Sequence, residues 1–242
     1  MSSKHVLAKK PWHIGARPGD IAEKVLTAGD PGRVAKISTL LDDPLKVSDK
    51  RGFLVYTGVY RGCKVSVVAH GIGAPSAAIV FEELHMLGAN VIIRLGTCGG
   101  LVEHVKLGGI VIPVGALFEA GGTVGIYVKG TCYPAVPEPE LVIRLEEAFR
   151  KHGFETYRGI VASSDAFHAE EHLTPKWRSL KAVAVEMECA TLFTLSRLRG
   201  FKSGAALMVI DNLATGIALK KEEIDGLELK AAKAALDALV SI

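Results

Sequence analysis

Short apolar runs alternate with amphipathic segments along the whole chain. The apolar runs are rich in Val, Ile and Ala, as is typical of buried strands, whereas the amphipathic segments repeat apolar residues with the period of a helix. The predicted strands are residues 24–28, 53–60, 63–70, 90–95, 109–114, 155–162 and 204–210. The predicted helices are residues 33–41, 75–87, 141–152, 187–198 and 222–240.

The order of these elements predicts an α/β fold. Strands separated by helices favour a largely parallel central sheet flanked by helices on both faces. Residues 53–60 and 63–70 are separated only by Arg61-Gly62, which predicts a hairpin and therefore a mixed sheet. Neither a linker nor an internal repeat divides the sequence, so we expect a single domain over residues 1–242. In such sheets ligands bind at the carboxyl ends of the strands.

The composition is that of a soluble globular protein. Of the 242 residues, 49% are hydrophobic and 23% are charged. The formal net charge is only +3 and is spread along the chain, so we expect no nucleic-acid partner. The apolar runs are broken by Gly, Pro or charged residues, and we therefore expect no membrane span.

Cysteine usage and the N-terminal residues predict a cytoplasmic protein. The four cysteines, at positions 63, 98, 132 and 189, form no CxxC pair, so we expect neither a metal site nor a disulfide framework. The first residues lack the apolar stretch of a signal peptide. Gln is absent and Asn occurs only at positions 90 and 212, which is typical of proteins from hot environments.

Two arginines near the ends of predicted strands favour an anion site. Gly29-Asp30-Pro31-Gly32-Arg33 lies where a strand gives way to a helix, and a helix N-terminus with an arginine suits phosphate. Arg94 interrupts a strand suited to burial and needs an anionic partner, from the protein or from a ligand. Thr97 offers a hydroxyl in the glycine-rich segment that follows. The alternative is a surface Arg33 and an Arg94 paired with a core carboxylate.

Acidic and aromatic residues beside other predicted strands are further candidates for ligand binding. Glu186 and Glu188 flank Met187 at the start of a helix, where carboxylates can bind a vicinal diol such as that of ribose, or can complement the helix dipole. Phe167 could stack on a base or pack in the core. Asp211 ends a strand, where it is either a general acid or the cap of a turn.

Taken in order, these segments resemble the nucleoside phosphorylase/uridine phosphorylase family of hexameric type, and within it the archaeal purine nucleoside and methylthioadenosine phosphorylases. The resemblance covers nearly the whole chain. It is carried by His13-Ile14, Gly29-Asp30-Pro31-Gly32-Arg33, Lys50-Arg51-Gly52, Gly71-Ile72-Gly73, Arg94-Leu95-Gly96-Thr97-Cys98-Gly99, Ser163-Ser164-Asp165-Ala166-Phe167, Val185-Glu186-Met187-Glu188 and Asp211-Asn212.

The resemblance implies a site shared between subunits. The implied phosphate ligands are Gly29, Arg33, Arg94, Thr97 and, from a neighbouring subunit, Arg51. The implied ribose-binding residues are Glu186, Met187, Glu188 and, across the dimer interface, His13. The implied base-binding residues are Cys98, Gly99, Phe167 and Val185, which face Asp211. The implied assembly is a homohexamer built as a trimer of dimers.

The activity that the resemblance implies is a pentosyl transfer of purine salvage. Inorganic phosphate, a co-substrate with no further cofactor, would cleave the N-glycosidic bond of purine ribonucleosides and give the free base and ribose 1-phosphate. 5′-Methylthioadenosine is a further candidate substrate. Asp211 would protonate the purine at N7, and a neutral aspartic acid near pH 7 requires burial or nearby negative charge.

Two departures from the family pattern bear on the substrate. No arginine follows Arg199, so the arginine that assists the acid in bacterial purine enzymes is missing or replaced by Lys220 or Lys221. Uridine phosphorylases carry a Gln and an Arg beyond the base-pocket Phe, whereas this chain has Ala169-Glu170-Glu171-His172, which favours purine over uridine. The alternatives are a uridine phosphorylase, a nucleosidase that uses water and a non-catalytic nucleotide-binding regulator.

Overall fold

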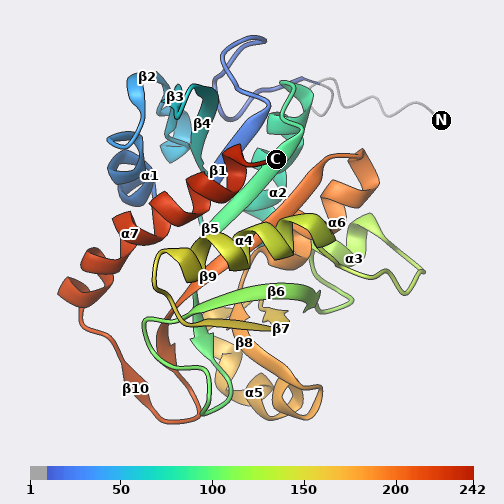
Figure 1. Ribbon diagram of the computed structural model, residues 1–242. Helices are drawn as coiled ribbons and strands as arrows, with labels where there is room; N and C mark the ends of the chain where they lie inside the picture. The colour runs from blue at the N-terminus through green and yellow to red at the C-terminus, as the bar shows by residue number, and fades with distance from the viewer. Residues whose placement is uncertain (1–9) are drawn as a thin grey trace.

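The computed structural model describes residues 10–242, which form a three-layer arrangement around one mixed sheet (Figure 1). The sheet order is β10-β9-β6-β7-β8-β5-β1-β4-β3-β2. The strands are β1 (Lys24–Ala28), β2 (Asp42–Ser48), β3 (Val55–Tyr60), β4 (Cys63–Ala69), β5 (Val91–Gly100), β6 (Ile110–Leu117), β7 (Thr156–Ser163), β8 (Ala182–Glu186), β9 (Lys202–Asn212) and β10 (Ile217–Ala218).

Part of the sheet closes on itself. Strand β9 runs parallel to β5 along the whole of β5 and also pairs antiparallel with β6. Strands β6, β7 and β8 follow one another in parallel, and the end of β8 returns to pair antiparallel with β5. Five strands therefore form a ring, and β1, β4, β3 and β2 extend from it to one side.

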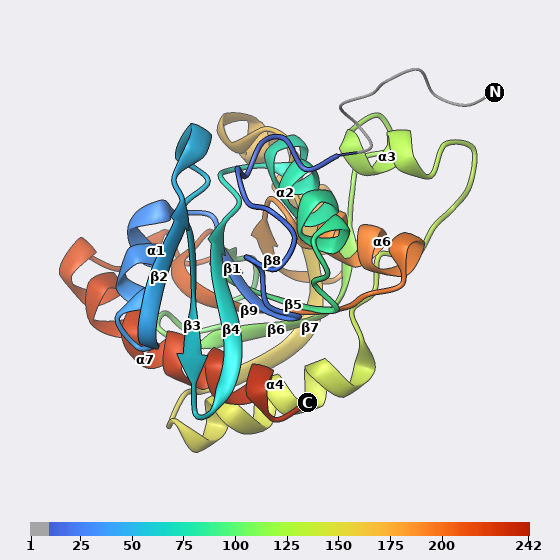
Figure 2. The ribbon, with the colours of Figure 1, turned by 90° about the horizontal axis from the view of Figure 1, so that it is seen from above.

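Helices cover both faces of the sheet, and each face has its own apolar core. The helices are α1 (Pro31–Ser38), α2 (Ala74–Met86), α3 (Thr123–Tyr127), α4 (Pro139–Lys151), α5 (Glu170–Ser179), α6 (Cys189–Arg199) and α7 (Lys221–Val240). Helices α1, α4 and α7 enclose one core, and α2 and α6 enclose the other (Figure 2). This arrangement confirms the predicted α/β class with a largely parallel sheet. None of the described helices has the length and apolar character that crossing a membrane requires.

Capping residues in the sequence set the ends of the helices near the site. The Asp30 carboxylate accepts hydrogen bonds from the N–H groups of Gly32 and Arg33, with Pro31 in the first turn of α1. Helix α6 ends at Gly200, whose φ of 85° is the left-handed conformation that glycine adopts freely.

The structure adds elements that the apolar pattern does not mark. Strand β2 is an exposed edge strand, and helix α5 is polar and contains Pro175. Neither element therefore shows a regular repeat of buried apolar residues. Strand β5 continues to Gly100, beyond the predicted end at residue 95, because its last residues pair with both β9 and β8.

Candidate active site

One cavity of about 1010 Å³ opens at the carboxyl ends of the strands. Its walls come from the carboxyl-terminal parts of β5, β8 and β9 and from the segments that follow β1, β4, β7 and β8, where the fold class places ligands. All of the predicted site residues except His13 line it, namely Gly29, Arg33, Arg51, Arg94, Thr97, Cys98, Gly99, Phe167, Val185, Glu186, Met187, Glu188 and Asp211. The predicted cluster is therefore brought together by the fold.

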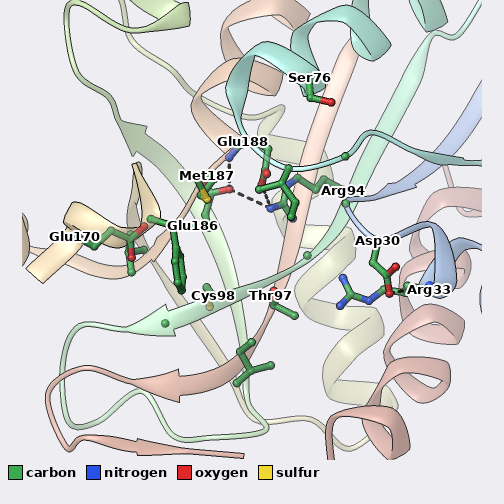
Figure 3. A pocket seen from close by; sticks show the side chains of 18 of the residues that line it. Asp30, Arg33, Ser76, Arg94, Thr97, Cys98, Glu170, Glu186, Met187 and Glu188 are labelled. Carbon is green, nitrogen blue, oxygen red and sulfur yellow. Dashed lines mark hydrogen bonds and ion pairs between the residues drawn. The ribbon is translucent and has the colours of Figure 1, made fainter. Parts of the chain in front are cut away.

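Arg94, from β5, lines the cavity, and its side chain points toward Glu188 (Figure 3). Its side chain is 5% exposed, and Nη2 donates a hydrogen bond to Glu188 and lies 3.4 Å from Glu186 Oε2. Nε and Nη1 are buried without a partner among the described residues. A Cβ at Gly96 would collide with the guanidinium, so glycine is required there. Arg94 thus has a carboxylate partner and retains N–H groups for an oxyanion.

Arg33 is held by the far end of the chain. Its Nε donates to Glu228 Oε1 of α7 over 2.9 Å, and both side chains are buried. Glu228 Oε2 also accepts from Lys36 Nζ over 2.7 Å. Both oxygens of the Glu228 carboxylate are therefore bonded, and this carboxylate fixes the Arg33 guanidinium at the cavity wall. The interpretation of Arg33 as a surface residue is wrong.

Glu188 faces the cavity, and both of its oxygens have a protein donor. Oε1 accepts the N–H of Gly73 over 2.6 Å, and Oε2 accepts from Arg94. Burial is the largest single influence and acts to raise the pKa of Glu188, but the Arg94 guanidinium, His70 and the N–H of Gly73 together hold this pKa below its usual range. Glu188 is therefore an ionised acceptor beside the oxyanion donors.

Glu186 has a different environment. Its Oε2 accepts the N–H groups of Glu188 and Cys189, over 2.8 and 2.9 Å, and its Oε1 accepts the hydroxyl of Ser163. Ser163 Oγ in turn accepts the N–H of Ala190. These bonds satisfy the first turn of α6, so Glu186 orients the neighbouring Glu188. Burial raises the pKa of Glu186, against the effect of Arg94.

Asp211 lines the cavity from the end of β9. It pairs in register with Gly99 of β5, where a Cβ would lie 3.1 Å from its Oδ1. The glycine thus keeps the space in front of the carboxyl open. Burial raises the pKa of Asp211 above its usual range, which favours the protonated form that a general acid requires.

Glu170 is a cavity residue that the sequence pattern did not reveal. It is the first residue of α5, is 8% exposed and lines the same wall as Phe167, whose ring is 63% exposed. Burial raises the pKa of Glu170, and the negative charges of Asp211 and Glu186 add to this effect. The sequence marked it only as part of Ala169-Glu170-Glu171-His172, the segment beyond Phe167 that departs from the uridine phosphorylase pattern, and assigned it no role of its own.

His13 is the predicted residue that lies away from the cavity of its own chain. Its Nδ1 is 2.6 Å from Glu83 Oε1, and the Glu83 carboxylate also accepts the N–H groups of Trp12, His13 and Ile14. Helix α2 therefore anchors this segment. Arg51 does line the cavity of its own chain. The contribution of either residue to a neighbouring subunit stays a prediction.

A three-layer α/β fold with arginines and carboxylates at the carboxyl ends of its strands is typical of enzymes that bind small anionic and hydroxyl-bearing ligands. The chain belongs to the phosphorylase superfamily, whose family model matches residues 23–241. This membership confirms the resemblance predicted from the ordered motifs.

Relatives of the chain carry several substrate names. It is 35% identical to a uridine phosphorylase of Thermococcus kodakarensis over 236 residues, which is 89% of this chain and 84% of that protein. It is 37% identical to a guanosine phosphorylase of Halorubrum lacusprofundi, over 87% of this chain and 86% of that protein. It is 35% identical to a DeoD-type purine nucleoside phosphorylase of Exiguobacterium sp., over 95% of this chain and 98% of that protein.

Proposed function

We propose that this protein cleaves purine ribonucleosides with inorganic phosphate and releases the free base and ribose 1-phosphate. The observation that carries the proposal is the position of Asp211, a half-buried carboxyl with a raised pKa, in one cavity with Arg33 and Arg94. The names of the relatives support a nucleoside phosphorylase. The choice of purine rests on Asp211.

The arginine end of the cavity suits the phosphate. Arg33 and Arg94 each present a guanidinium there, Gly29 leaves the backbone of the β1–α1 turn accessible, and Thr97 adds a hydroxyl. The resemblance assigns a third guanidinium to Arg51 of a neighbouring subunit, and the Arg51 of this chain also lines the cavity. Bound there, phosphate is both the nucleophile and an anion beside the developing positive charge on ribose.

The ribose would lie between phosphate and base, on Met187 and Glu188. An ionised Glu188 can accept hydrogen bonds from two vicinal hydroxyls, because each carboxylate oxygen has a second lone pair. Met187 provides an apolar contact surface. Glu186 keeps the first turn of α6 in place.

Asp211 would act on the base. A phosphate oxygen bonds to C1′ as the C1′–N9 bond breaks, the electron pair of that bond passes to the purine, and the Asp211 proton passes to N7. The purine leaves neutral, and solvent returns a proton to Asp211. Cys98, Gly99, Phe167 and Val185 form the walls around the base.

Uridine is the second candidate base, because a relative with 35% identity is named a uridine phosphorylase. A pyrimidine has no N7 for Asp211 to protonate. The hydrogen-bonding edge of a pyrimidine needs both donors and acceptors from the protein. The segment beyond Phe167 contributes Glu170, a carboxyl side chain, to the cavity lining. Purine is therefore the better match for these side chains.

A nucleoside panel with and without phosphate tests the proposal. We expect release of free base from purine nucleosides only when phosphate is present, with ribose 1-phosphate as the co-product. The panel contains adenosine, inosine, guanosine, 5′-methylthioadenosine and uridine. Base release without phosphate would identify a nucleosidase, and a preference for uridine would contradict the purine assignment.

We also propose a homohexamer, a trimer of dimers, in which His13 acts in the site of a neighbouring subunit. The support is that Glu83 fixes His13 outside the cavity of its own chain. Mixing a His13→Ala chain with an Asp211→Asn chain tests this, because a mixed dimer with exchanged His13 has one site with both residues intact. We expect the mixture to exceed the activity of either variant refolded alone, and no gain would contradict the exchange.

A further inference from the structure

Two carboxyl side chains line the base end of the cavity, and the reaction above uses only one of them. Asp211 comes from the end of β9, and Glu170 comes from the start of α5. Glu170 is only 8% exposed, although the proposed reaction assigns this residue no role. Figure 3 shows its side chain at the side of the cavity where Glu186 and Met187 lie.

Because Glu170 is buried, the hydrogen bonds of its carboxylate decide which ligands this part of the cavity favours. Ser164 is buried beside it, and Ser164 Oγ accepts the N–H of Ala166 over 3.2 Å, which leaves the hydroxyl proton free for the Glu170 carboxylate. That carboxylate has further lone pairs, and among the described residues no lysine or arginine is a main influence on its ionisation. A buried acceptor of this kind favours ligands that bring a hydrogen-bond donor and disfavours those that bring a lone pair.

The Hoogsteen edge of a purine offers a matching pair of groups. N7 is an acceptor in every purine. The neighbouring group at position 6 is an amino donor in adenine and a carbonyl acceptor in guanine and hypoxanthine. A protonated Asp211 at N7 beside an ionised Glu170 at position 6 therefore complements adenine. With a 6-oxopurine, the carbonyl oxygen would face a carboxylate.

We propose that Glu170 determines base specificity and that the substrates are nucleosides of 6-aminopurines, a class that includes adenosine and 5′-methylthioadenosine. This inference rests on the proposed function. Burial and the charge of Asp211 both raise the pKa of Glu170, so a single shared negative charge is favoured over two. One proton on the pair gives one donor and one acceptor, as the adenine edge requires.

The test compares adenosine with inosine in the wild type and in Glu170→Gln. We expect wild-type kcat/KM to favour adenosine by at least about tenfold. The glutamine amide can donate to a carbonyl oxygen, so Glu170→Gln should lower kcat/KM for adenosine roughly 10- to 100-fold and raise it for inosine. The matched control is Glu171→Gln, an exposed residue on the same helix that does not line the cavity.

A third substrate controls for damage to the site. Purine riboside carries only hydrogen at position 6, so its kcat/KM should be the same in the wild type and in Glu170→Gln. An unchanged adenosine-to-inosine ratio in the folded variant, or a wild type that prefers inosine, would overturn the inference and leave the proposed function standing. Absence of phosphate-dependent cleavage of any nucleoside would contradict the proposed function itself.

Discussion

Arg94 links the two ends of the sugar-phosphate subsite. Its one bonded nitrogen holds Glu188, the proposed ribose acceptor, while Nε and Nη1 await an anion. A fully buried guanidinium with unpartnered N–H groups is costly, and an incoming oxyanion removes that cost. In the proposed reaction the same side chain would both orient the ribose acceptor and bind the nucleophile.

Replacing Arg94 by lysine tests this double role. Lysine keeps the positive charge that Glu186 and Glu188 require but loses the planar fork of donors. Loss of one charge-assisted hydrogen bond corresponds to about 1.5–3 kcal/mol, so we expect the KM for phosphate to rise by roughly tenfold or more. Arg144→Lys, on the exposed face of α4, is the control and should leave the KM unchanged. A folded Arg94→Lys variant with an unchanged KM for phosphate would exclude Arg94 from the phosphate site.

The residue scale also shows what the sequence can and cannot predict. An arginine within an apolar strand predicts a buried cation, and Arg94 is one. The identity of its partner could not be predicted, because Glu188 is 94 positions away and only the closure of the sheet brings it near. Glu170 escaped prediction because α5 is polar, and burial of its first residue depends on the neighbouring strands.

At the scale of elements, prediction succeeded where burial has a regular period. Strand β1 lies at the predicted residues 24–28, and α4 and α7 lie within two residues of their predicted bounds. Strand β2 has exposed residues and contains Pro44, so its pairing with β3 rather than its own pattern makes it a strand. Local pattern therefore defines the elements of the core, and edge elements depend on their neighbours.

Two exposed glycines, one inside helix α7 and one at the end of helix α6, should respond to alanine substitution with opposite changes in Tm. Gly226 lies inside α7 with no atom within 4 Å of an added Cβ, and alanine is favoured there by about 1 kcal/mol. We expect Gly226→Ala to raise Tm by about 2–4 °C. Gly200→Ala should instead lower Tm, because φ is 85° at that position and a side chain costs about 1–2 kcal/mol. Shifts of the same sign in calorimetry would contradict this account of the two helices.

At the scale of the whole molecule, the ring of β5, β9, β6, β7 and β8 is the feature that the sequence did not predict. Each of these strands reads as an ordinary strand of an open parallel sheet. The closure depends on β9 pairing with β5 and β6 at once, which involves residues far apart in the chain. The ring and the β1–β4 side of the sheet together bring Asp211 and Arg33 to one cavity.

Buried His70 makes the stability of the molecule depend on pH. It directly follows β4 and is fully buried, with Nδ1 2.8 Å from Gly71 O and Nε2 unpartnered among the described residues. Burial, with the nearby Arg94 charge, lowers the pKa of His70 to about 4. The unfolded chain, with a pKa near 6.5, therefore binds a proton first as the pH falls.

The sign of the effect follows from this difference. The free energy of unfolding should decrease as the pH falls from about 6.5 to about 4, by roughly 3 kcal/mol from this residue. His70→Asn keeps an N–H donor and does not titrate, so urea unfolding of this variant should show a shallower loss over the same interval. Most carboxylates titrate alike in both proteins and cancel in the comparison; Glu188, whose pKa the His70 charge lowers, is the exception. Equal slopes would exclude His70 as the source.

The central claim is that Asp211 delivers a proton to N7 of a purine, and substitution by asparagine tests it most directly. Asparagine has nearly the same volume but no carboxyl proton, and general acid catalysis contributes about 10²- to 10⁴-fold. We expect Asp211→Asn to slow phosphorolysis of an unmodified purine nucleoside within that range. A 7-methylated purine nucleoside already carries the positive charge that protonation supplies, so its cleavage should be far less affected. Equal losses on the two substrates would contradict the account.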